Sequence, residues 1–205
     1  MRVLFRALFA ASVLWCAGAG VASAQAAATA ALEHQLTAEE IRSIARREVL
    51  WCDEYRASSD DCDALTLIRL APDGRLIETT SLLISENPRL IAFIGDIDEI
   101  TDNRVCSKVK AADMPITFTL DGKVVPKEAA AGLRALLATS LTEFDGKTVC
   151  QTFFRGEDPT RLREEVTVDG VRREDLETRY LLREGTDGFS LRPQVTGDEK
   201  PPTRL

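Results

Sequence analysis

Apolar residues recur at helical spacing in two segments of the chain. Thr37 and Glu40 have the spacing of a capping box, which predicts a helix from near Ala38 to about Trp51. A second helical segment begins at Pro126, a first-turn proline, and Gly146 ends it. The apolar stripes are Ile41, Ile44, Ala45, Val49 and Cys52 in the first segment, and Leu133, Leu136, Leu137, Leu141 and Phe144 in the second.

Elsewhere apolar and polar residues alternate, and Asp-Gly pairs interrupt the alternation. The pairs at 73–74, 121–122 and 169–170 are strong turn signals, so we predict three β-hairpins. Asn87-Pro88 precedes a predicted buried strand at 90–94, and residues 95–103 are predicted to be an acidic loop. The expected hairpin strands are 65–70 with 76–84, 115–120 with 123–125, and 164–168 with 176–183.

Two helices that are each followed by antiparallel strands are typical of an α+β fold. We expect an antiparallel sheet built from β-hairpins, with the two main helices packed on one face. A single domain of this kind would span residues 37–193. The alanine-rich segment 25–36 lacks a hydrophobic period and is predicted to be a flexible lead-in, and 194–205 is predicted to be a disordered tail.

The first 24 residues have the pattern of a secretory signal peptide. Arg2 and Arg6 precede an apolar stretch that ends near Val21, and Ala22 and Ala24 fit the small-residue pattern before a cleavage site. No later apolar run approaches the length needed to span a membrane. We therefore predict a periplasmic or secreted protein without a transmembrane segment after cleavage of the signal.

Four cysteines remain once the signal is removed, and an even number in an exported chain indicates two disulfides. Three connectivities are possible, and we favour Cys52 with Cys62 and Cys106 with Cys150, because neighbours along the chain meet first during export. A zinc site is disfavoured, since no two of these cysteines have CxxC spacing and the chain has a single histidine.

The charge balance argues against a nucleic-acid partner. The chain has 26 Lys and Arg against 33 Asp and Glu, a net charge of −7, and the leader arginines make the remainder more acidic. The densest basic runs are interleaved with carboxylates, so we interpret them as solvated surface. These runs are Arg42, Arg46 and Arg47, then Arg161 and Arg163, then Arg172 and Arg173.

The sequence offers little that is typical of catalysis. The single histidine, His34, falls in the predicted lead-in, where nothing would fix its ring, and the cysteines are assigned to crosslinks. We therefore predict no catalytic residue, no metal site and no cofactor. Neighbouring carboxylates leave a glycosidase-like acid pair open. These groups are Asp53 with Glu54, Asp60 with Asp61 and Asp63, and Asp96 with Asp98 and Glu99.

Trp51 and Tyr55 are the candidate binding residues, because tryptophan and tyrosine are frequent in binding hot spots. The alternative is that Trp51 packs inside the core. The leading hypothesis is an exported, non-catalytic module that binds a protein, an envelope component or a small ligand on its sheet. A carboxylate-dependent hydrolase of the cell envelope is the alternative, and a deep pocket lined by acids with displaced pKa values would favour it.

Overall fold

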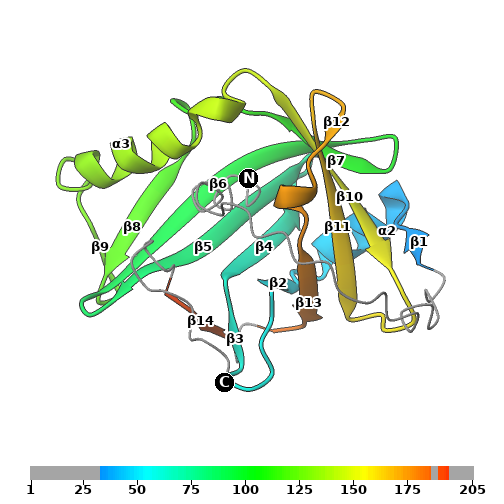
Figure 1. Ribbon diagram of the computed structural model, residues 1–205, viewed down its shortest axis with the longest axis horizontal. Helices are drawn as coiled ribbons and strands as arrows, with labels where there is room; N and C mark the ends of the chain where they lie inside the picture. The colour runs from blue at the N-terminus through cyan, green and yellow to red at the C-terminus, as the bar shows by residue number, and fades with distance from the viewer. Residues whose placement is uncertain (1–32, 186–188, 194–205) are drawn as a thin grey trace, which may run out of the picture.

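Antiparallel β-strands make up most of the structure. It is a computed structural model that describes residues 33–185 and 189–193, and it is shown in Figure 1. Of these residues, 49% are in strands and 16% in helices, with two α-helices. The predicted α+β fold is therefore wrong, and the domain is mainly β. The two α-helices lie at opposite ends of the sheet rather than together on one face (Figure 1).

The elements follow one another with short connections. In the first half they are β1 (His34–Gln35), α2 (Ala38–Arg46), β2 (Leu50–Asp53), β3 (Asp61–Cys62), β4 (Ala64–Leu70), β5 (Leu76–Glu86), β6 (Arg89–Thr101) and β7 (Arg104–Lys108). In the second half they are β8 (Ile116–Leu120), β9 (Lys123–Val124), α3 (Ala131–Ser140), η2 (Thr142–Phe144), β10 (Thr148–Arg155), β11 (Arg161–Val168), β12 (Val171–Arg172), η3 (Glu174–Leu176), β13 (Arg179–Arg183) and β14 (Ser190–Leu191).

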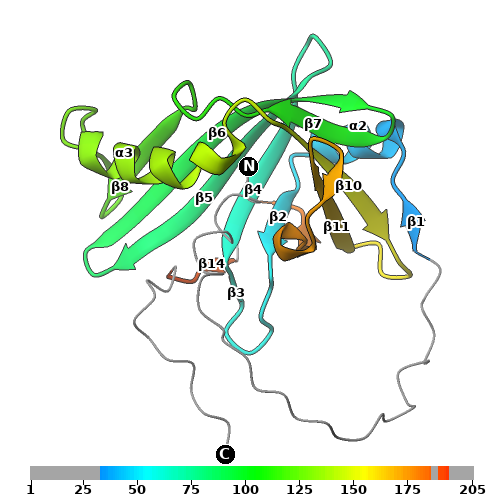
Figure 2. The same cartoon turned by 45° about the horizontal axis from the view of Figure 1, so that its top comes forward.

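Eight of the strands form a closed ring. Strands β10, β11, β13, β2, β4, β5 and β6 are neighbours in that order, and β7 pairs with both β6 and β10. Every pairing in the ring is antiparallel. Figure 2 shows β7 between the ends of β6 and β10, where it closes the ring. Side chains on each strand therefore alternate between an inner and an outer face.

The inner face carries two apolar clusters. One includes Trp51, Phe153 and Tyr180, whose rings meet edge to face with centroids 5.0 to 6.2 Å apart. Helix α2 packs into this cluster through Ile41 and Ile44. The other cluster is built on β5, β6 and β8 and is covered by α3 through Leu137. The two helices thus close different parts of the core.

Both helices are shorter than the periodicity predicts. Thr37 and Glu40 form the expected capping box, but α2 ends at Arg46, and residues 50–53 are strand β2. Glu48 has a φ of 51°, a left-handed conformation that does not continue a helix. In the second segment α3 begins at Ala131 and is followed by the short helix η2, and Leu136 is 69% exposed. In both segments, the helical spacing of apolar residues therefore continues past the residues that are actually helical.

The three Asp-Gly hairpin turns are confirmed. They connect β4 with β5, β8 with β9, and β11 with β12. The predicted strand from 176 differs, because residues 174–176 are η3 and the strand begins at Arg179. The predicted acidic loop is also wrong, since β6 continues to Thr101. Its acidic residues alternate with apolar ones, but Asp98 faces inward while Ile97 is 53% exposed, the inverse of the usual pattern.

The predicted lead-in ends too late in the sequence. His34 and Gln35 pair with β10, and Leu36 is fully buried in the core, so the structured part includes these residues. The predicted signal peptide and the tail from residue 194 lie outside the described residues.

The two disulfides have the predicted connectivity. Cys52 is bonded to Cys62, and Cys106 to Cys150. Cys106 and Cys150 are direct partners in the β7–β10 pairing, so their bond lies in the ladder that closes the ring.

Candidate functional site

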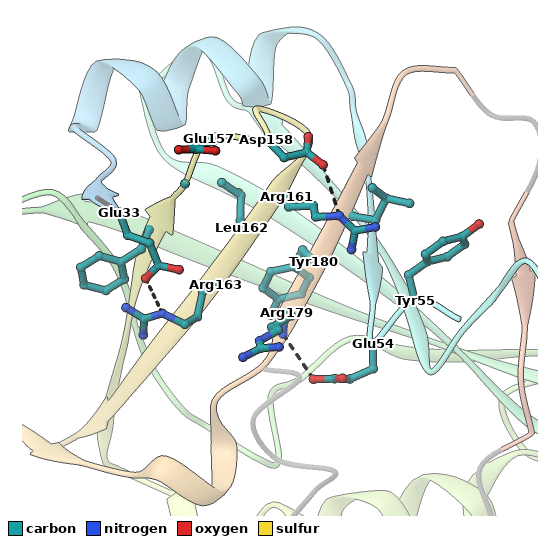
Figure 3. A pocket seen from close by; sticks show the side chains of 13 residues that line it. Glu33, Glu54, Tyr55, Glu157, Asp158, Arg161, Leu162, Arg163, Arg179 and Tyr180 are labelled. Atoms are coloured by element: carbon teal, nitrogen blue, oxygen red, sulfur yellow. Dashed lines mark hydrogen bonds and ion pairs between the residues drawn. The ribbon is translucent and has the colours of Figure 1, made fainter. Parts of the chain in front are cut away.

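A cavity of about 510 Å³ lies on the outer face of the ring, over β11 and β13. We call it the arginine groove, because three arginines, Arg161, Arg163 and Arg179, line it (Figure 3). The other lining residues are Glu33, Glu54, Tyr55, Phe154, Gly156, Glu157, Asp158, Leu162, Tyr180 and Leu181.

Strand alternation places the arginines outside. In β11, Leu162 and Glu164 are buried, and the residues on either side, Arg161 and Arg163, face outward. The register of β11 and β13 then sets Arg163 directly opposite Arg179. Like charges directly opposite in an antiparallel pair are unfavourable. The sheet therefore places two guanidinium groups next to each other, and the carboxylates of Glu33 and Glu165 compensate the charge of Arg163.

Protein groups hold Arg163 firmly. Its guanidinium donates to Glu33 Oε2 at 2.8 Å and to Glu165 Oε1 at 2.7 Å. It also lies over the ring of Phe154, 4.4 Å from the centroid, which is within cation–π range. These contacts come from the residue before β1, from β10 and from β11, so the position of Arg163 is fixed from three parts of the chain.

Arg161 is held by the connection between β10 and β11. Its Nε lies 3.2 Å from Asp158 Oδ2. Hydrogen bonds from the Thr160 hydroxyl and backbone N–H, together with Arg161, lower the pKa of Asp158. This carboxylate therefore stays ionised and is used within the protein.

The guanidinium of Arg179 differs from those of the other two arginines. Arg179 is exposed. Its guanidinium makes no hydrogen bond or ion pair with any of the described residues, 33–185 and 189–193. Its backbone N–H donates to Glu54 Oε1 at 3.4 Å, the same oxygen that accepts from the Thr178 hydroxyl at 3.1 Å. The groove thus contains one cation that is available to a ligand.

A second group of charged residues lies on the inner face. Glu78 is directly opposite Asp96 across β5 and β6, and Asp98 is one inward position further along β6. Burial raises the pKa of Asp98 to about 8, with further contributions from the charges of Glu78 and Asp96, and burial likewise raises the pKa of Asp96. The Thr80 hydroxyl donates to Glu78 at 2.9 Å. We call Glu78, Asp96 and Asp98 the inner acids.

The other carboxylates singled out in the sequence have different surroundings, although Asp61 and Asp63 share one partner, the guanidinium of Arg192. Asp53 is buried beside Thr178, whereas its neighbour Glu54 lines the arginine groove. Asp61 forms a bidentate ion pair with Arg56, at 2.9 Å for each bond. Glu99 faces outward into another cavity, of about 470 Å³, beside the Cys106–Cys150 bond.

The two candidate binding residues also have different environments. Trp51 is 1% exposed and packs against Phe153 and Tyr180, so it offers no surface to a partner. Tyr55 lines the arginine groove, donates to Asp60 at 2.9 Å and packs on Phe189. His34 is ordered but 56% exposed, lies 3.3 Å from Glu40, and does not line the groove.

The interleaved carboxylates of the sequence indicate solvated surface at Arg161 and Arg163, and no local pattern singles out Arg179. The alternation Arg161-Leu162-Arg163 predicts two arginines on one face of a strand. The contribution of Arg179 depends on strand register, which the sequence pattern does not fix.

Three further findings concern metal binding, membrane spans and known proteins. No group of three His, Cys, Asp or Glu side chains within the described ranges is arranged to hold a metal ion. None of the helices in the described part of the chain is long and apolar enough to cross a membrane. Comparison with protein-family models, curated proteins and solved structures finds no match.

Proposed function

We propose that this protein is an exported, non-catalytic binding module that holds its ligand in the arginine groove through an anionic group. Export is supported by the signal-like N-terminal sequence and by the two disulfides, which persist in oxidising compartments. The pairing of Arg163 with Arg179 is the observation that carries the ligand assignment.

The groove has the properties expected of a preformed anion site. Arg163 is already fixed by Glu33, Glu165 and Phe154, so a ligand would not have to order it. Arg179 supplies an uncompensated fork of N–H donors, which suits a carboxylate or phosphate group. A bound anion would compensate the charge of Arg179, which no carboxylate of the described residues pairs with, whereas Arg163 is already paired with Glu33 and Glu165.

A carboxylate-dependent hydrolase remains the second candidate, and one observation favours it. The raised pKa values of Asp96 and Asp98 resemble those of general acids. However, none of the inner acids is among the residues that line the cavities of about 510, 470 and 400 Å³ on the described part of the chain. A general acid must come within hydrogen-bond reach of its substrate, so we prefer the binding module.

Calorimetric titration of the mature protein with succinate, citrate and inorganic phosphate tests the proposal. We expect saturable binding of at least one of these anions at one site. Arg179→Gln should weaken it about tenfold or more, because a hydrogen bond to a charged group is lost. The matched control is Arg89→Gln, since Arg89 is an exposed arginine at the start of β6, outside the groove.

Two results would reject the proposal. One is the absence of saturable binding by all three anions. The other is an equal loss of affinity in the Arg179 and Arg89 variants, which would mean that the anions respond to overall charge rather than to the groove.

A further inference from the structure

The charges of the arginine groove do not fit a ligand that is simply an anion. Four carboxylates, those of Glu33, Glu54, Glu157 and Asp158, line it beside the three arginines. A purely anionic ligand would gain from Arg179 but would be repelled by any carboxylate that is not already neutralised. The internal partners of each carboxylate therefore decide which ligand chemistry fits.

Three of the four carboxylates have partners inside the protein. Glu33 is paired with Arg163 at 2.8 Å, and Asp158 with Arg161 at 3.2 Å. Glu54 accepts hydrogen bonds from the Thr178 hydroxyl and from the backbone N–H of Arg179. These carboxylates are used to position neighbouring groups.

Glu157 is the remaining carboxylate. It is exposed in the connection between β10 and β11, and within the part of the chain that the structure describes it has no hydrogen bond or ion pair. The adjacent Gly156 lies against Glu33, where an added Cβ would be 3.9 Å from Glu33 Cγ. Figure 3 shows Glu157 at the end of the groove away from Arg179.

One cation and one carboxylate thus remain available, at different ends of one cavity. The half-buried side chains of Phe154 and Leu181 also line this cavity and add apolar surface to it. A volume of about 510 Å³ lies within the range of small-ligand pockets.

We infer that the ligand is zwitterionic, namely a short peptide with free termini whose carboxylate binds Arg179 and Arg163 and whose ammonium binds Glu157. This inference rests on the proposed function, which assigns an anionic group to the ligand, and it adds a cationic group that binds Glu157. The apolar lining accommodates a side chain of the peptide.

The test compares three forms of one dipeptide by calorimetry: free alanyl-leucine, its N-acetyl form and its C-terminal amide. We expect the free dipeptide to bind most tightly. Glu157→Gln should weaken the free dipeptide about two- to fivefold, as expected for an exposed ion pair, and leave the N-acetyl form unchanged. Arg179→Gln should weaken the free dipeptide and leave the amide unchanged.

Glu86→Gln is the matched control for Glu157, because Glu86 is an exposed glutamate at the far end of β5. It should leave the affinity of all three forms unaltered. If Glu86→Gln weakened binding of the free dipeptide as much as Glu157→Gln does, the effect would come from the overall charge of the protein. That result would overturn the inference.

The possible failures are distinguishable. If the N-acetyl form binds as tightly as the free dipeptide, or if no dipeptide form binds while succinate does, the inference is overturned and the proposed anion site stands. The amide could instead bind as tightly as the free dipeptide, with no effect of Arg179→Gln on the binding of dipeptides or succinate. That result would overturn both the inference of a zwitterionic ligand and the proposed anion site.

Discussion

The inner acids and the arginine groove place charged residues on opposite faces of the same ring of strands. On the inner face, Glu78, Asp96 and Asp98 are gathered on β5 and β6, and burial raises the pKa values of both aspartates. On the outer face, hydrogen bonds from Thr160 lower the pKa of Asp158. The residue types are similar, so the difference comes from solvent and from neighbouring donors.

This contrast separates a structural role from a binding role. With a pKa of about 8, Asp98 is mostly protonated at neutral pH and can donate a hydrogen bond inside the core. In the groove, Arg179 and Glu157 are exposed, and an accessible charged group is what recognition of a charged ligand needs. Raised carboxylate pKa values therefore mark the core here, and charged side chains without partners among the described residues mark the candidate site.

The largest expected effect compares two neighbouring phenylalanines on opposite faces of β10. Phe153 is 2% exposed and packs against Trp51 and Tyr180, whereas Phe154 lies under Arg163 in the groove. Phe153→Ala should lower the free energy of unfolding by about 3–5 kcal/mol through lost burial and a cavity. Phe154→Ala should lower it by about 1 kcal/mol.

Urea denaturation monitored by circular dichroism measures both values. Equal losses in the two variants would contradict the assignment of an inner and an outer face on β10.

The next effect is the pH dependence of stability. An unfolded Asp98 titrates near 3.8 and the folded one near 8, so the folded protein binds more protons between these pH values. The free energy of unfolding should therefore fall as the pH rises from about 4.5 to 8. Each unit of pKa difference that is titrated corresponds to about 1.4 kcal/mol.

Asp98→Asn isolates the contribution of this group. Its neighbours Glu78, Asp96 and Ser107 remain in place, and the amide stays neutral at every pH. The variant should be more stable than the unmodified protein at pH 8 and should show a flatter pH profile. An unchanged slope would mean that Asp98 is not buried as a neutral acid.

The sequence predicts local features of this fold better than its overall class. The Asp-Gly turns and the capping box of Thr37 and Glu40 are decided by neighbouring residues, and both are confirmed. The helix expected to run to Trp51 is wrong, because Val49 and Trp51 fit a strand period as well as a helical one. The loop predicted at 95–103 is wrong because tertiary structure buries Asp98, which local polarity argues against.

The site was less accessible to prediction than the fold. Cysteine pairing could be proposed from order along the chain, and it is confirmed. The groove depends on Glu33 from the segment before β1, on Arg163 from β11 and on Arg179 from β13. Their meeting requires strand order and register, which arise from long-range packing and are not encoded in any local motif.

The smallest expected effect on stability compares the two arginines that face each other. Arg163→Gln should lower the free energy of unfolding by about 1 kcal/mol, since it loses Glu33, Glu165 and the ring of Phe154. Arg179→Gln should leave it unchanged within about 0.5 kcal/mol or raise it slightly, because it removes a like charge opposite Arg163. Urea denaturation of both variants at low salt measures the difference. A loss in Arg179→Gln as large as that in Arg163→Gln would show that Arg179 stabilises the fold, and the argument that it is kept for a ligand would no longer hold.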